Sequence, residues 1–175
     1  FGGGTNSMIK QGQPYGMLQR TKLLTFLSTE SFIALGTELP DGIYGWARAP
    51  FYALKSEKAQ KFLKKYRDAN NGEYPNDWGV LAYDVMYFIK ETVERAGGTD
   101  ALKMRAAAAS FTFDSLRGPL RMRALDNTFN SPVFIGVSKK VPEYPFPIMV
   151  DVNVIPGDLV LPSEAVVMKL RKEAK

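Results

Sequence analysis

The sequence predicts an α/β fold in which crossover helices connect the strands of a parallel sheet. Up to residue 49, short apolar or alternating runs of strand length alternate with helical runs. Crossover connections between parallel strands produce this order. From residue 56 onward, three helical runs in succession lie between two strand-rich parts. This arrangement indicates a chain that leaves one lobe and later returns to it.

The first fifty residues are punctuated by Gly, Pro and capping residues. Thr5 or Asn6 can cap the first helix, and Pro14 and Gly16 stop it. The strand-length runs are apolar or alternate with aromatic residues. The expected elements are a Gly-rich loop at 1–4 leaving a strand that precedes Phe1, a helix at 7–13, a strand at 22–27, a helix at 29–34 and a strand at 42–49.

Three helices are expected next. Ser56 begins the first, which stops at Asn70-Asn71-Gly72, a sequence typical of a helix C-terminus. The second covers 77–96 and the third 101–110. The second carries apolar residues around most of its circumference, so we expect it to be largely buried, with Trp78, Tyr83 and Tyr87 in the core. Its main stripe comprises Trp78, Leu81, Ala82, Val85, Ile89 and Val93.

The last third of the chain is rich in strands. A turn is expected at 117–119, strands at 120–125, 132–137 and 147–154, and a C-terminal helix from Pro162-Ser163-Glu164. The end of this helix is basic, as the helix dipole favours.

Composition excludes several chemistries. Apolar residues make up 45% and charged residues 23%, as in a soluble globular protein, and no run approaches the roughly 18 apolar residues of a membrane span. The absence of Cys and His removes thiol nucleophiles, the commonest general base and most transition-metal sites. We therefore expect no catalytic residues and no metal site. The net charge of +5 does not indicate nucleic-acid binding, because no helix combines a basic stripe with interleaved aromatic residues.

Several short motifs occur in a specific order and spacing. They are Phe62 to Tyr66 with Tyr74-Pro75, Ala82-Tyr83-Asp84, Ala96-Gly97-Gly98-Thr99-Asp100, and Phe113 through Arg123 with Asp126. In these motifs the chain resembles the type I periplasmic solute-binding proteins of ABC importers, in the branched-chain amino acid and amide group. The resemblance covers nearly the whole chain.

The resemblance implies two Rossmann-like lobes that close around a small solute, without catalysis and without a cofactor. Residues 1–48 and 145–175 would belong to lobe 2, and residues 52–140 to lobe 1. The family is roughly twice this length, so we expect the C-terminal half only, with the N-terminal half of the same protein and the transporter permease as partners. The expected location is periplasmic or extracytoplasmic. The sequence starts at Phe1 without Met or a signal segment, so we expect a processed or truncated chain.

Ligands of open α/β sheets bind beyond the carboxyl ends of the strands, where two loops are candidates. In the first, Gly3, Gly4 and Thr5 would let the backbone and helix N–H groups approach a solute; a plain tight turn is the alternative. In the second, Ser28 and Thr29 precede Glu30, which matches the acidic residue that pairs with the solute ammonium in amino-acid-binding relatives. The alternative is a Glu favoured by the helix dipole.

Residues near the first expected crossing between lobes have two interpretations. One interpretation is that they line the cleft, and the favoured one is that they pack the core or the hinge; they are Tyr44, Trp46, Phe51 and Tyr52. Arg48 either pairs with an acidic solute or with a surface carboxylate. Asp84, among apolar neighbours, is expected to cap a helix or accept from a backbone amide rather than act as a base.

Together these features predict the extracytoplasmic solute-binding component of an ABC importer. It would bind a small amino acid, amide or aromatic or carboxylic acid between two lobes. The alternative is a ligand-sensing regulatory or receptor domain of the same fold. An enzyme, perhaps a carboxylate-based hydrolase, is disfavoured by the missing His and Cys.

Overall fold

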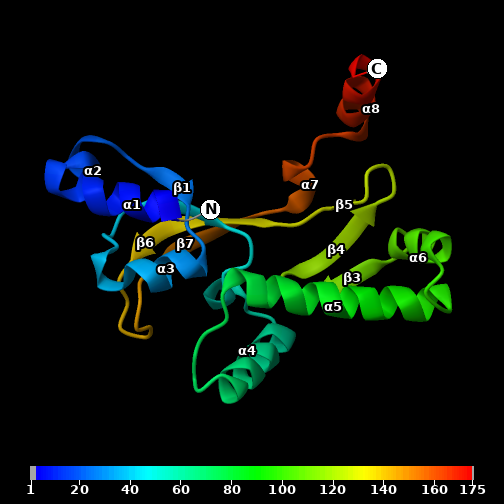
Figure 1. The fold of residues 1–175 in the computed structure, drawn as a ribbon, viewed down its shortest axis with the longest axis horizontal. Helices are drawn as coiled ribbons and strands as arrows, with labels where there is room; N and C mark the ends of the chain where they lie inside the picture. The colour runs from blue at the N-terminus through cyan, green and yellow to red at the C-terminus, as the bar shows by residue number, and fades with distance from the viewer. Residues whose placement is uncertain (1–2, 175) are drawn as a thin grey trace. The chain divides into compact units, whose positions relative to one another are not determined.

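The computed structural model describes residues 3–174, which form two compact units (Figure 1). Unit 1 contains residues up to 82 together with 133–154, and unit 2 contains 83–132 together with residues from 155 onward. The boundary at 82 falls within the longest helix, α5 (Asp77–Ala96). The assignment of 1–48 and 145–175 to lobe 2, and of 52–140 to lobe 1, stays a prediction.

Unit 1 is built on a four-stranded sheet. The strand order is β1-β2-β6-β7, with β1 at Leu24–Phe26, β2 at Tyr44–Ala47, β6 at Val133–Lys139 and β7 at Ile148–Ile155. Strands β1 and β2 are parallel, and Phe26 is opposite Trp46. Strands β2 and β6 are antiparallel. The sheet is therefore mixed, and the expected parallel pairing holds for β1 and β2.

Two glycines let this sheet pack closely against its neighbours. Gly45 of β2 is opposite Gly136 of β6. A Cβ at Gly45 would lie 2.8 Å from Cδ1 of Leu27, and one at Gly136 would lie 2.7 Å from the carbonyl oxygen of Val150. Because the second contact is with backbone, a side chain at Gly136 would require the sheet itself to move.

The helices of unit 1 follow the expected order with shifted bounds. They are α1 (Gly3–Gly12), η1 (Gln13–Tyr15), α2 (Met17–Arg20), α3 (Thr29–Leu35), η2 (Gly36–Glu38), η3 (Phe51–Ala53), α4 (Glu57–Ala69) and the start of α5. The loop expected at 1–4 is wrong for Gly3 and Gly4, which form the first turn of α1; Phe1 and Gly2 lie outside the described residues. The first turn tolerates them because its N–H groups need no partner within the helix.

An aromatic cluster lies beside α3 in unit 1. The ring of Phe51 lies 4.8 Å from that of Tyr74 and 5.6 Å from that of Tyr144, and Tyr52 contacts Phe32 of α3 edge-on. Phe51 and Tyr52 are buried, so they pack the core, as the favoured interpretation held. Burial also raises the pKa of the Tyr52 phenol above its ordinary value.

Unit 2 packs the second half of α5 on a small antiparallel sheet. The sheet has the order β3-β4-β5, and the unit also contains three shorter helices. Phe88 of α5 provides the main apolar contact, with ring centroids 5.4 Å from Phe111, 5.6 Å from Phe113 and 4.8 Å from Phe129. The elements are β3 (Thr112–Ser115), β4 (Gly118–Arg123), β5 (Thr128–Phe129), α6 (Ala101–Ala108), α7 (Gly157–Val160) and α8 (Glu164–Glu173).

Asp84 fixes α5 to the turn between β3 and β4. Its Oδ1 accepts a hydrogen bond from the backbone N–H of Leu116 at 2.8 Å, and its Oδ2 pairs with Nε of Arg117 at 3.0 Å. Both side chains of the ion pair are buried. The prediction that Asp84 accepts from a backbone amide is confirmed, and the buried arginine is an additional partner.

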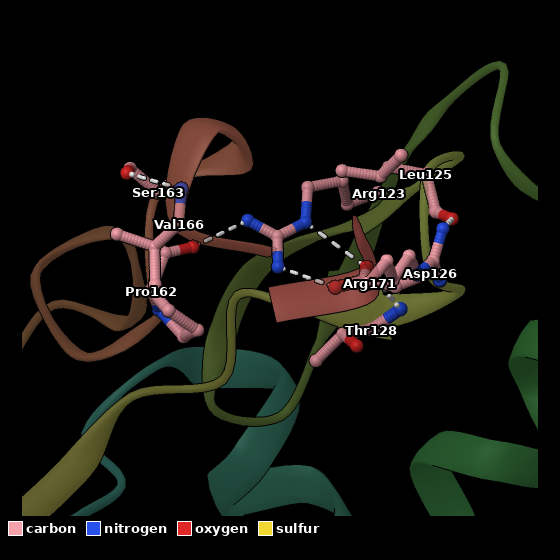
Figure 2. A network of polar contacts seen from close by, with 8 residues as sticks. All are labelled: Arg123, Leu125, Asp126, Thr128, Pro162, Ser163, Val166 and Arg171. Carbon is pink, nitrogen blue, oxygen red and sulfur yellow. Dashed lines mark hydrogen bonds and ion pairs between the residues drawn. The ribbon is translucent and has the colours of Figure 1, made fainter. Parts of the chain in front are cut away.

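A polar network holds the C-terminal segment within unit 2 (Figure 2). Arg123 pairs with Asp126 through two bonds of 2.9 and 2.5 Å, and its Nη1 donates to the carbonyl of Pro162 at 2.7 Å. Arg171 of α8 donates to the carbonyl of Leu125 at 3.0 Å. The hydrogen bond from Arg123 lowers the pKa of Asp126 from 3.8 to about 2.

The expected burial of α5 is wrong. Trp78 is 60% exposed and Met86 64%, and Val85, Tyr87 and Ile89 are also exposed. Trp78 and Tyr87 are therefore not core residues. The physical reason is that one row of α5, centred on Phe88, faces the sheet of unit 2. Among the described residues of unit 2, no element covers the adjacent row of Val85, Met86 and Ile89. None of the helices in this range is both long and apolar enough to cross a membrane.

Candidate functional site

The candidate site lies at the carboxyl ends of β1 and β2. Because these strands are parallel, the residues that follow them meet at one edge of the sheet. Ser28, Thr29 and Glu30 follow β1 through Leu27, and Arg48 and Ala49 directly follow β2. Loops at this edge are the usual position of ligands in open α/β sheets.

Asp77 joins the two strand ends. Its Oδ1 accepts hydrogen bonds from the N–H and the hydroxyl of Thr29 at 3.1 and 2.9 Å. Its Oδ2 accepts from the N–H groups of Arg48 and Ala49, both at 3.1 Å. The residue is 2% exposed. One buried carboxylate thus binds four donors and fixes the backbone of both loops relative to each other.

Asp77 is available for this role because its neighbour caps the helix. The side-chain oxygen of Asn76 accepts from the N–H of Gly79 at 2.8 Å, which satisfies a free donor of the first turn of α5. Asn76 and Asp77 are adjacent in the sequence at the start of this helix, but nothing in the sequence indicates that the second residue binds distant backbone. Sequence reasoning therefore missed Asp77 as the residue that organises the site.

Glu30 lies in the first turn of α3, immediately after the residue that Asp77 holds. Both of its carboxylate oxygens are buried, and neither has a hydrogen-bond partner among residues 3–174. A buried carboxylate without donors is costly, because the desolvation of the charge is not compensated. A cationic or hydrogen-bond-donating group is therefore the chemical complement of this side chain.

Arg48 presents the opposite charge at the same edge. The carbon at the centre of its guanidinium lies 4.9 Å from the ring centroid of Phe26 and 5.0 Å from that of Trp78. Phe26 in turn contacts Trp46, with centroids 4.6 Å apart. Within the described part of the chain, the guanidinium forms no ion pair, so the surface carboxylate that the sequence allowed as its partner is not found there.

The remaining predicted site residues differ in their surroundings. Ser28 is buried at the N-cap of α3 without making a side-chain cap bond, and the hydroxyl of Thr29 donates to Asp77. Gly3 and Gly4 are exposed on the first turn of α1, where a Cβ would meet no atom within 4 Å. Close packing therefore does not require glycine there. The roles of Gly3, Gly4, Thr5, Ser28, Thr29 and Glu30 as ligand contacts stay predictions.

Comparison with protein families decides what kind of chain this is. The family described as periplasmic binding protein matches residues 1–140. The chain belongs to the periplasmic binding protein family. A comparison with curated proteins finds no match. The predicted resemblance is thereby confirmed, and so is the predicted α/β fold, since solved structures of periplasmic binding proteins share it.

Solved periplasmic binding proteins align with most of this chain but with less than half of their own length. A periplasmic binding protein from Burkholderia mallei has a TM-score of 0.78 and 20% identity, covering 93% of this chain and 43% of its own. A solute-binding protein from Rhodopseudomonas palustris, solved with 4-hydroxybenzoate, has a TM-score of 0.69 and 19% identity, covering 85% and 42%.

A further match is the leucine-, isoleucine-, valine-, threonine- and alanine-binding protein from Brucella ovis. It has a TM-score of 0.68 and 15% identity, covering 89% of this chain and 41% of its own. At these identities the likeness shows the fold. The chain thus spans about two fifths of the length of the periplasmic binding proteins that it matches.

Proposed function

We propose that this chain is part of the solute-binding component of an ABC importer and that Glu30 and Arg48 bind the solute. Membership in the periplasmic binding protein family supports the general role, because this is a family of solute-binding transport components rather than enzymes. The family also supports an extracytoplasmic location and a transporter permease as partner. The rest of the same polypeptide would complete the cleft.

The observation that carries the proposal is the buried carboxylate of Glu30, which has no hydrogen-bond partner in the described part of the chain. Family resemblance implies an ammonium-binding acidic residue at this position, and the buried carboxylate is an independent physical argument for that role. The Thr29 backbone is held by Asp77, so the position of Glu30 is fixed by the fold rather than by its own contacts. A preorganised acceptor of this kind binds a charged donor without further ordering of the protein.

The charges at the site favour an amino acid as the solute. Its ammonium would neutralise Glu30 and its carboxylate would pair with Arg48, and the aromatic rings of Phe26 and Trp78 would contact an apolar side chain. A hydroxybenzoate, as in the R. palustris structure, also carries a carboxylate and a donor. Its neutral phenol would leave the charge of Glu30 uncompensated, and we therefore place it second.

Titration calorimetry on the product of the complete reading frame tests this proposal. The panel contains aliphatic amino acids and 4-hydroxybenzoate, and the variants are Glu30→Gln and a control, Glu57→Gln. Glu57 lies on α4 with its side chain 82% exposed. Loss of a charge-assisted hydrogen bond should weaken amino-acid binding about 10- to 150-fold in Glu30→Gln. The control should bind as the unaltered protein does. Unchanged amino-acid affinity in Glu30→Gln would refute the role of Glu30.

A further inference from the structure

A groove of about 480 Å³ lies on unit 1, between helix α3, the loop that follows α4, and the loop between β6 and β7. All of its lining residues belong to unit 1, and none of them belongs to the candidate solute site. Its volume is within the range of small-molecule pockets, about 300–1,000 Å³. The side chains that shape the groove are Ile33, Arg67, Glu73, Tyr74, Pro145 and Phe146.

Aromatic rings from separate segments form one wall of this groove. The ring centroid of Phe146 lies 5.8 Å from that of Tyr74 and 6.3 Å from that of Tyr144. Tyr74 also stacks on the buried ring of Phe51, with centroids 4.8 Å apart. Because each ring packs against others, the wall is already ordered, and a planar apolar group can pack on it without further ordering of side chains.

Arg67 adds a positive charge to the groove. The carbon at the centre of its guanidinium lies 4.3 Å from the ring centroid of Tyr74, and its Nε donates to the carbonyl of Gly72 at 3.0 Å. These two contacts hold the guanidinium in place. Among the residues that the structure describes, neither Nη group has a hydrogen-bond or ion-pair partner. Both can therefore donate to the two oxygens of a carboxylate on a ligand.

Glu73 lines the same groove and brings a negative charge to it. Its carboxylate would repel a second negative charge on a ligand, while Arg67 attracts the first. Together with the aromatic wall, these charges favour a planar ring that carries a single carboxylate. An aliphatic anion would leave the ring faces without a partner, and a neutral aromatic molecule would do the same to the Nη groups of Arg67.

We propose that this groove is an accessory binding site for an aromatic monocarboxylate, separate from the solute site. The carboxylate would pair with the Nη groups of Arg67, and the ring would pack on Phe146 and Tyr74. A second copy of the chain and polypeptide encoded outside residues 1–175 are the competing occupants. Either of them would close the groove to small molecules, whereas the proposed ligand requires it to be open in the complete protein.

Benzoate and benzamide are the probes, because they share a ring and differ in charge. Their binding to the product of the complete reading frame is measured by ligand-observed NMR. Arg67→Gln removes the guanidinium, and the control Lys61→Gln removes a positive charge from the same helix at a side chain that is 71% exposed. Arg48→Gln removes the guanidinium assigned to the solute carboxylate, so each variant is also made in that background. Circular dichroism checks folding, and Arg67→Lys, which keeps the charge but loses the planar fork, replaces Arg67→Gln if it does not fold.

We expect benzoate to bind with a Kd of about 1 mM, since it has few atoms and the groove is open. Benzamide should bind about 5- to 10-fold more weakly, because it cannot form a charge-assisted pair with an exposed arginine. Arg67→Gln should weaken benzoate binding by the same factor, and Lys61→Gln should leave it unchanged, with or without Arg48→Gln.

Two results would overturn the proposal. Benzoate binding that is lost in Arg48→Gln and kept in Arg67→Gln would assign benzoate to the solute site. Absence of saturable benzoate binding would show that the groove is closed or does not recognise this class of ligand. Analytical ultracentrifugation would then distinguish a second copy, whose contact depends on protein concentration, from polypeptide of the same chain.

Discussion

Replacing Asp77 with Asn should destabilise unit 1 strongly although the two side chains have the same shape. The side-chain oxygen of Asn can replace Oδ1 and accept the two hydrogen bonds from Thr29. The amide nitrogen would then replace Oδ2, where it cannot accept from the N–H groups of Arg48 and Ala49. At about 1–3 kcal/mol for each buried donor left without an acceptor, the free energy of unfolding should fall by about 2–6 kcal/mol. The loops at Thr29 and Arg48 would then no longer be held in place relative to each other.

The chain's two tryptophans, Trp46 and Trp78, both lie in unit 1, so urea unfolding followed by tryptophan fluorescence reports on this unit. The matched control is Asp68→Asn, which removes an exposed ion pair with Lys64 on α4 and should change the free energy of unfolding by less than about 1 kcal/mol. If Asp77→Asn shifts the unfolding curve no more than the control, the reasoning that Asp77 organises the site is wrong.

Two predictions concern unit 2. Asp84→Ala leaves Arg117 as a buried charge and the N–H of Leu116 without its acceptor, so the free energy of unfolding followed by circular dichroism should fall by about 3–5 kcal/mol; a loss below about 1 kcal/mol would contradict this. The lowered pKa of Asp126 means that its pair with Arg123 stabilises the fold above pH 3.8 and that this contribution is lost as the pH falls toward about 2. In Asp126→Asn the free energy of unfolding should therefore fall less steeply as the pH decreases from 3.8 to about 2. An unchanged dependence on pH would contradict the stabilising role of this ion pair.

Local signals were sufficient for the helices with good caps. Ser56 caps α4 by accepting from the N–H of Ala59, and Ser163 caps α8 by accepting from Val166. The Asn70-Asn71-Gly72 stop is also found, with positive φ at Asn71 and Gly72. These boundaries were predictable because a cap depends on a few neighbouring residues.

Elements that depend on distant partners were predicted less well. Strand β3 and helix α7 were not expected, and β3 exists through its pairing with β4. The antiparallel pairing of β2 with β6 joins residues about ninety positions apart. No local pattern specifies which strand becomes the neighbour of another, because pairing is decided by the surface that each strand buries.

The candidate site also contains residues that the sequence could indicate and residues that only distant contacts reveal. Glu30 could be proposed from its position after β1 and from family resemblance, because strand order alone places that loop at the ligand-binding edge. Asp77 could not be proposed, because its four donors come from residues 28 to 48 positions away in sequence. The contacts of Arg48 with Phe26 and Trp78 likewise join three separate elements.

By itself the sequence determined the family, the α/β class and the main helix boundaries, since these follow from composition, periodicity and short capping motifs. Tertiary structure alone decided which apolar residues are buried, as the exposed side chains of Val85, Met86 and Ile89 on α5 demonstrate, and which carboxylates are satisfied. Asp77 and Glu30 are both acidic residues in the first turn of a helix. Only the packing of separate segments surrounds the first with donors and leaves the second without any donor from residues 3–174. The reason is that hydrogen bonding and desolvation depend on neighbours in space rather than in sequence.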